Sequence, residues 1–134
     1  MFNLILISHG NFSSGILHAA ELILGKQENV YIFSVQKNCD LEQLKSRIAD
    51  QLQLSATSDV DVLILTDLFF GTPFNIVNSL MERFNFQHVT GMNLPLLIEI
   101  MSRRNEESII NILSEALPAA KGAMIDCVAY FNSD

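Results

Sequence analysis

The sequence predicts an α/β protein built on a doubly wound, mostly parallel sheet of five strands. Short apolar runs alternate along the chain with segments of helical period, which is the succession that builds βαβ units. The first and third runs are apolar at consecutive positions, as in parallel strands that are covered on both faces. Right-handed crossovers then place helices on both faces of the sheet. The 134 residues contain no repeat, low-complexity tract or linker, so we expect one domain over residues 1–134.

The strands are expected where the apolar runs fall, at Phe2–Ile7, Val30–Val35, Val60–Thr66, Phe86–Gly91 and Ala123–Tyr130. The last run alternates apolar and polar residues more than the first and third do. Such alternation is typical of an edge strand, or of a strand exchanged with a partner.

Between the first three strands we expect two amphipathic helices. The segment Ser13–Leu24 gathers its apolar residues on one face, and Gly25 follows as the stop. The segment Leu41–Leu54 repeats leucine and isoleucine in helical step, and Asp40 with Gln43 forms a capping box ahead of it.

Three further helices are expected after the third strand. Thr72 is placed to cap a helix that has Pro73 at its first position. Asn93 is placed to cap a short helix that runs through Arg103. The segment Glu106–Leu117 has a period of about 3.6 residues.

Composition excludes several classes of protein. The formal charge of −7 argues against nucleic-acid binding, which depends on clustered Lys and Arg. Cys39 and Cys127 match no metal or redox spacing and are expected to be reduced structural thiols. No segment approaches the ~20 apolar residues of a membrane span, and the first residues lack the features of a signal peptide. We therefore expect a cytoplasmic protein without direct membrane insertion.

Reactive side chains stand where two of the expected strands end. His9 follows the first strand, and Asp67 follows the third. Ligands of open α/β sheets bind at the carboxyl ends of the strands. If the first and third strands are neighbours, His9 and Asp67 emerge at the same rim, close enough to form a hydrogen bond. A carboxylate that accepts the Nδ1 proton would leave Nε2 as a nucleophile. Taken alone, His9 also fits a structural hydrogen-bonding role, and Asp67 fits a turn or capping role.

Small polar residues and glycines follow His9 and open a helix, among them Gly10, Asn11 and Ser13. A helix N-terminus attracts anions through its unpaired N–H groups and its dipole. A nucleophilic imidazole beside such a site indicates phosphoryl transfer through a phosphohistidine. Phe69 and Phe70 follow Asp67 in a turn, where at least one of them is a candidate for a docking surface.

Three motifs together resemble a known family. The segments LILISHGNFSSGIL, LILTDLFFGTPFNIV and VTGMNLPLLIEIMSRR look like the enzyme IIA domain of the mannose/fructose/sorbose family of the bacterial phosphotransferase system (PTS). The resemblance extends through essentially the whole chain and includes LGKQENVYIF between the first two blocks.

The resemblance implies a flavodoxin-like fold and a homodimer in which the C-terminal strand is exchanged between subunits. It also implies that the phosphocarrier HPr donates a phosphoryl group to the active-site histidine, which passes it to a IIB component. Membrane components (IIC and IID) then act in sugar uptake. No cofactor and no metal are implied.

Carried over by position, His9 would be the phosphorylated residue, on Nε2, and Asp67 would be its carboxylate partner. Thr72 would be the hydroxyl residue that contacts the site. Gly71, Pro73, Phe74 and Asn75 match the turn that shapes the rim, and Asn93 and Pro95 match the loop after the fourth strand.

The chain departs from the family pattern at Phe70. Relatives often carry two glycines before the hydroxyl residue, where this chain has Phe70 and Gly71. The additional ring is expected to narrow access or to change partner preference, whereas Phe69 stands where relatives often carry a large aromatic residue. Many relatives have IIB fused behind a linker. Since this chain ends at Asp134, IIB is expected as a separate polypeptide or as a part missing from this sequence.

Three other classes of protein remain as alternatives. A histidine phosphatase needs an arginine directly before the histidine, and this chain has Ser8 there. An FMN-binding flavodoxin could use the Ser/Gly loop for the phosphate, but the chain has no Trp and no obvious ring sandwich. A receiver-like domain could use Asp67 as the phosphoryl acceptor, but the acidic pair and the lysine of such a site are not visible.

Overall fold

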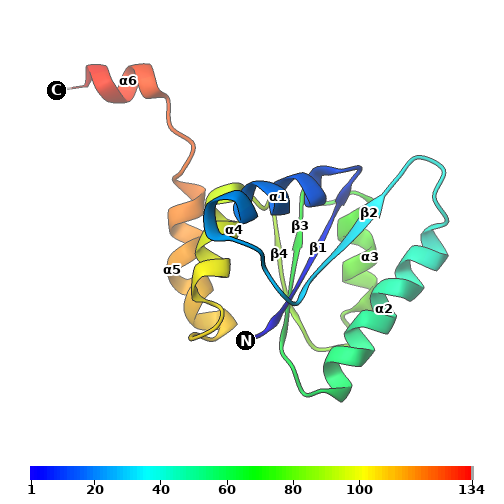
Figure 1. Cartoon of the computed structure of the whole chain (residues 1–134). Helices are drawn as coiled ribbons and strands as arrows, with labels where there is room; N and C mark the ends of the chain where they lie inside the picture. The colour runs from blue at the N-terminus through cyan, green and yellow to red at the C-terminus, as the bar shows by residue number, and fades with distance from the viewer. Residues whose placement is uncertain (134) are drawn as a thin grey trace.

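The computed structural model describes residues 1–133, so Asp134, the last residue of the predicted domain, lies outside the described residues. A four-stranded parallel sheet forms the centre of the molecule, in the order β2-β1-β3-β4 (Figure 1). The strands are β1 (Asn3–His9), β2 (Val30–Val35), β3 (Val62–Thr66) and β4 (Gln87–Thr90). The predicted α/β class and parallel sheet are confirmed.

Helices cover both faces of this sheet (Figure 1). One face packs against α1 (Phe12–Leu24), α4 (Leu94–Arg103) and α5 (Ile109–Lys121), and the other against α2 (Leu41–Thr57) and α3 (Thr72–Leu80). Alternate residues of β1 face the two sides, so that Leu4 and Leu6 belong to the first core and Ile5 and Ile7 to the second. All four are fully buried, and each such side chain contributes about 1.5–3 kcal/mol of transfer free energy.

Side-chain caps fix where several helices begin. Asp40 accepts a hydrogen bond from the Gln43 N–H (3.1 Å), and Asn93 accepts one from the Leu96 N–H (2.9 Å), as the sequence predicts. Ser108 caps α5 by accepting from the Asn111 N–H at 3.2 Å, so this helix begins later than the expected Glu106.

The predicted cap of α3 is wrong. Gly71 occupies the capping position, and Thr72 is the first helical residue. Gly71 has φ 101° and ψ 172°, a backbone conformation that glycine adopts and that residues with a side chain rarely do. The start of α3 is therefore set by this glycine, followed by Pro73 in the first turn.

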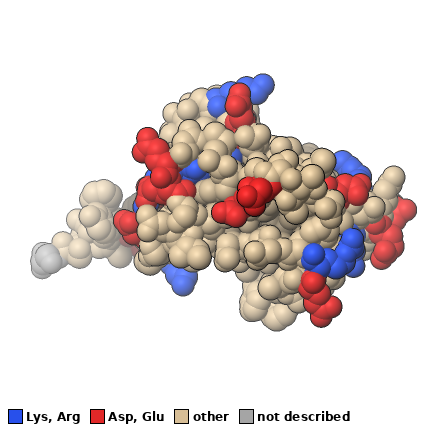
Figure 2. Space-filling view, turned by 90° about the horizontal axis from the view of Figure 1, so that it is seen from below, with Lys and Arg blue, Asp and Glu red and all other residues tan. Residues whose placement is uncertain are grey.

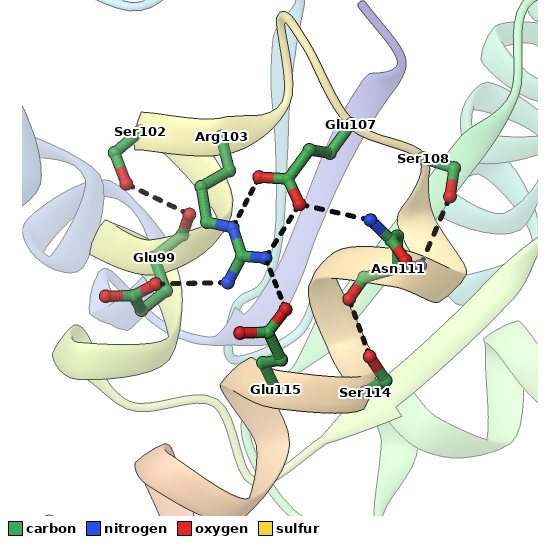
Figure 3. A network of polar contacts seen from close by, with 8 residues as sticks. All are labelled: Glu99, Ser102, Arg103, Glu107, Ser108, Asn111, Ser114 and Glu115. Atoms are coloured by element: carbon green, nitrogen blue, oxygen red, sulfur yellow. Dashed lines mark hydrogen bonds and ion pairs between the residues drawn. The ribbon is translucent and has the colours of Figure 1, made fainter.

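Arg103 ties α4 to α5 through a network of carboxylates (Figure 3). Its guanidinium donates to both oxygens of Glu107 at 2.6 and 2.7 Å and to Glu115 at 3.1 Å, with Glu99 at 3.5 Å. The hydrogen bonds from Arg103 lower the pKa of Glu107 and keep that carboxylate ionised. The neighbouring Arg104 is 2% exposed and instead donates to the backbone carbonyls of Phe2, Glu28 and Asn29.

Charges on the face opposite the carboxyl ends of the strands are mixed. Figure 2 shows acidic and basic groups scattered there among other residues, without a continuous basic patch. Of the helices in residues 1–133, none combines the length and apolarity needed to cross a membrane.

The fifth strand expected over Ala123–Tyr130 is not formed in residues 1–133. Cys127–Asn132 form the short helix α6, capped by Asp126, which accepts from the Ala129 N–H at 3.1 Å. Figure 1 shows α6 projecting away from the sheet, and none of its residues is buried. A strand needs the N–H and C=O groups of a neighbouring strand, whereas a helix satisfies its own, so the isolated segment becomes helical.

Candidate functional site

The candidate site lies at the carboxyl ends of β1 and β3. The chain leaves β1 toward β2 on one side of the sheet and returns through α2 to β3 on the other side, which makes the gap between β1 and β3 the topological switch point. The two strands are in register from Asn3 opposite Val62 to Ile7 opposite Thr66. His9 ends β1, and Asp67 follows β3 directly.

The predicted contact between His9 and Asp67 is present. His9 Nδ1 lies 2.8 Å from Asp67 Oδ2, and the same oxygen accepts the His9 backbone N–H at 2.9 Å. The other oxygen, Oδ1, accepts the Leu68 N–H at 3.0 Å. The carboxylate is thus held by three hydrogen bonds while 11% of its side chain is exposed.

The electrostatics of this pair determine which ring nitrogen carries the proton. Partial burial acts to raise the pKa of Asp67, but the hydrogen bonds from the His9 backbone and ring, together with the charge of the ring, outweigh it and hold the pKa below 3.8. An ionised carboxylate only accepts hydrogen bonds, so Nδ1 must be the donor. Neutral His9 therefore presents an unprotonated Nε2, and 47% of its side chain is exposed.

Gly71 lies against the outer edge of the imidazole. A Cβ atom built on Gly71 would stand 3.5 Å from His9 Cε1 and 3.8 Å from Nε2. The backbone at the start of α3 thus approaches the nitrogen that Asp67 leaves unprotonated. Within residues 1–133, no hydrogen bond joins the Thr72 hydroxyl to His9 or Asp67.

The start of α1 differs from the expected anion site. The Gly10 N–H donates to the Val35 carbonyl (2.9 Å), and the Ser13 N–H donates to the Ser8 hydroxyl (2.8 Å). Ser13 is fully buried, so the structure does not bring it to a ligand surface. Asn11 remains exposed at the N-terminus of α1, and its side-chain oxygen accepts from Gln36 at 3.4 Å.

Aromatic residues of the loop after β3 form an exposed cluster beside the site. The rings of Phe69 and Phe70 stack with centroids 4.1 Å apart, and each forms an edge-to-face pair with Phe74, with centroids 5.2 and 5.3 Å apart. Phe69 and Phe70 remain 65% and 62% exposed. Phe70 has φ 63°, a left-handed conformation that favours glycine.

The loop after β4 contributes support. Asn93 caps α4 through its side-chain oxygen, and its amide group donates to the Ala120 carbonyl at 3.0 Å. Pro95 follows in the first turn of α4. Both polar groups of Asn93 are therefore engaged within the fold.

Within residues 1–133, no group of three or more His, Cys, Asp or Glu side chains could hold a metal ion.

Sequence reasoning missed a polar cluster behind the site. The hydroxyl of Thr66, the residue before Asp67, contacts Thr90 Oγ1 at 2.8 Å and His88 Nε2 at 2.9 Å. Thr66 and Thr90 are paired across β3 and β4, and His88 lies two residues before Thr90 on β4. The cluster therefore depends on the register of these two strands, which the sequence did not reveal.

The sequence matches the family described as "PTS system fructose IIA component" over residues 3–117. The PTS system fructose-specific EIIA component of Bacillus subtilis (strain 168) is 27% identical over 115 residues, which is 85% of this chain and 78% of that protein. The sorbose-specific EIIA component of Lacticaseibacillus casei is 29% identical over 115 residues, with 85% and 82% covered. The mannose-specific EIIAB component of Escherichia coli (strain K12) is 30% identical over 101 residues, 75% of this chain but 31% of that longer protein.

Solved structures agree with these matches. The phosphotransferase system component EIIA from Streptococcus agalactiae superposes with a TM-score of 0.85 at 26% identity, covering 96% of this chain and 99% of the other. The PTS IIA protein associated with the fucose utilization operon from Streptococcus pneumoniae has a TM-score of 0.84 at 27% identity, with 98% of each chain covered.

Proposed function

Because the chain belongs to the family of PTS system fructose IIA components, we propose that His9 accepts a phosphoryl group on Nε2 and passes it on within a sugar-specific PTS. The observation that carries this proposal is the 2.8 Å contact between His9 Nδ1 and Asp67 Oδ2. This contact supports a proton on Nδ1, which leaves the Nε2 lone pair available for attack on phosphorus.

The transfer step balances without a cofactor. The Nε2 lone pair forms the new N–P bond while the bond between phosphorus and the donor nitrogen breaks, and that nitrogen keeps the electron pair. The His9 ring gains positive character, which the Asp67 carboxylate stabilises through the Nδ1 proton. Asp67 thus contributes more after transfer has begun than before it.

The start of α3 is the best candidate for holding the phosphoryl oxygens. Gly71 stands next to Nε2, and the first N–H groups of a helix have no partner inside that helix. The Thr72 hydroxyl belongs to the same turn and is the proposed side-chain contact. Gly10 and Asn11 border the site from the α1 side, while Ser13 supports the backbone from within.

The proposed partners are the phosphocarrier HPr as donor and a IIB component as acceptor, acting with the membrane components IIC and IID. The exposed Phe69 and Phe70 rings offer these partners an apolar contact beside His9. Phe12, at the start of α1 and three residues after His9, is a further exposed ring (47%). We place this activity in the cytoplasm.

We also propose that two copies of this domain form a homodimer through the C-terminal tail. Met124, Val128 and Phe131 are 95%, 73% and 79% exposed, an apolar surface that a second copy would cover. In the exchanged arrangement, Ala123–Tyr130 would form a strand beside the partner's sheet. Sedimentation of the full chain and of a variant lacking residues 123–134 tests this: loss of the dimer is expected, and an unchanged dimer would contradict the role of the tail.

The experiment that tests the function is a reconstituted relay of phosphoenolpyruvate, enzyme I and HPr. Wild-type protein should take one acid-labile, alkali-stable label, and His9→Ala should take none. His18→Ala is the matched control, since His18 is exposed on α1, and it should label fully. A label that persists in His9→Ala, or an alkali-labile label that is lost in Asp67→Ala, would instead indicate an aspartyl phosphate of receiver type.

A further inference from the structure

Thr66 connects the site to the edge of the sheet. It is fully buried, and its carbonyl accepts the N–H groups of Gly91 and Met92 at 3.0 and 3.1 Å. Its hydroxyl contacts Thr90 Oγ1 and His88 Nε2, at 2.8 and 2.9 Å. The end of β3 is therefore fixed by both its backbone and its side chain immediately before Asp67.

His88 supplies the outer end of this hydroxyl cluster. It lies on β4 opposite Ile64, and its ring centroid is 5.5 Å from that of Phe74. The helix α3, which carries Phe74, contains no charged residue from Thr72 to Leu80, and the facing positions of β3 are apolar apart from Thr66. The half-buried ring of His88 thus meets the Thr66 hydroxyl and lies beside the ring of Phe74.

We propose that His88 is a positioning residue for the reaction at His9: it holds the Thr66 hydroxyl and thereby fixes the backbone from which Asp67 reaches the His9 ring. This inference rests on the proposed function for its reaction and on the contacts of Thr66 for its geometry.

The reason for a positioning role is the narrow geometry that Asp67 must satisfy. A single oxygen, Oδ2, meets the His9 N–H and the ring Nδ1 at 2.9 and 2.8 Å. A rotation of the backbone at the end of β3 would lengthen one of these two contacts of Oδ2 even where the other is kept. Displacements of about 1 Å at a reacting group can cost a factor of about 100 in rate.

Proton counting adds a requirement. Thr66 has one hydroxyl proton and two polar neighbours, so it donates to one and accepts from the other. If His88 donates from Nε2, Thr66 donates to Thr90, and the three groups form a directed chain. Removal of the imidazole leaves a fully buried hydroxyl with one partner fewer.

The test compares His88→Leu with His88→Gln. The Gln amide can place a donor or acceptor near the position of Nε2, whereas Leu fills space without one. Two readouts are used: the single-turnover rate of labelling from phosphorylated HPr, and the tautomer of the His9 ring from its ¹⁵N chemical shifts. The second readout needs no donor, so it reports on positioning even if wild-type protein takes no label.

We expect the His88→Leu protein to be labelled about tenfold more slowly, with an unchanged HPr concentration at half-saturation. The fraction of the His9 ring that carries its proton on Nδ1 should also fall. His88→Gln should recover the rate to within about threefold of wild type. His18→Leu, on the exposed face of α1, should change neither readout. A folded His88→Leu protein with wild-type rate and tautomer overturns the proposal, and so does a His88→Gln protein as slow as His88→Leu.

Thr66→Val keeps the proposal testable if His88→Leu fails to fold. It removes the hydroxyl with little change of shape, and it should slow labelling and shift the His9 tautomer as His88→Leu does. Wild-type values in a folded Thr66→Val protein would overturn the positioning role.

Discussion

Substitution of Asp67 by Asn tests the proton assignment most directly. The carboxylate accepts from three N–H groups, with Oδ2 serving both groups of His9 and Oδ1 serving Leu68. The amide offers one acceptor in place of two. If its oxygen faces His9, its NH₂ group opposes the Leu68 N–H across about 3 Å. If its NH₂ group faces His9, it opposes the His9 N–H and requires Nδ1 to accept, which moves the ring proton to Nε2.

The magnitude follows from the bond that is lost. A hydrogen bond to a charged group contributes about 1.5–3 kcal/mol, and 1.36 kcal/mol corresponds to a factor of ten in rate. Because 47% of the His9 side chain is exposed, solvent screening favours the lower end of this range. We therefore expect Asp67→Asn to slow phosphoryl transfer by about 10- to 30-fold.

The assay is rapid-quench labelling from ³²P-labelled HPr under single-turnover conditions. Asp40→Asn is the matched control, because Asp40 caps α2 far along the chain and Asn caps helices about as well as Asp. Circular dichroism should show both variants folded. An Asp67→Asn protein that labels within twofold of the wild-type rate would refute the argument that Asp67 determines the tautomer of His9.

Other parts of the structure yield further predictions. In urea unfolding, the free energy of unfolding of Phe70→Gly should exceed that of Phe70→Ala by about 1 kcal/mol. Both variants lose the ring contacts, but Ala keeps the strain of φ 63°. Gly71→Ala should lower the free energy of unfolding by about 1–3 kcal/mol and slow labelling, because φ 101° excludes a side chain; Gly15→Ala, inside α1, should do neither. Arg104→Met should lower the free energy of unfolding in urea by about 1–3 kcal/mol, since it removes the donor to the Phe2 and Glu28 carbonyls, whereas the Asn29 carbonyl keeps the Leu4 N–H. Burial lowers the pKa of His88 below 6.5, so the unfolded chain binds more protons and stability should fall as pH drops through and below 6.5; His88→Gln should flatten this slope.

The sequence predicts the layers of the fold because each layer depends on neighbours along the chain. The fully apolar run of Leu4–Ile7 indicates a strand that is covered on both faces, and both cores contain it. Asp40 and Asn93 were recognisable as caps, because a cap acts on an N–H group three residues ahead. Local pattern was sufficient in these places.

The site was predictable in part for the same reason. His9 and Asp67 both end strands, and parallel strands that are neighbours bring their ends together. Ser13 misled because a serine at a helix start is a candidate ligand contact, whereas here its N–H meets Ser8 and its side chain is inside. The contact of Gly71 with the His9 ring depends on the backbone conformation of the loop, which the hydrophobic periodicity of the sequence does not predict.

The C-terminal segment shows where local pattern stops. The alternation of apolar and polar residues in Ala123–Tyr130 indicates that one face of the segment suits burial. A strand also requires a neighbouring sheet edge with unpaired N–H and C=O groups. In the single chain, this segment lies away from the sheet, and a six-residue helix with no buried residue gains little from packing. In the isolated chain, little packing energy therefore holds this segment in the helical conformation. Docking on a second sheet would supply both the backbone partners and the apolar burial that the alternation anticipates, so the conformation of the tail should depend on protein concentration.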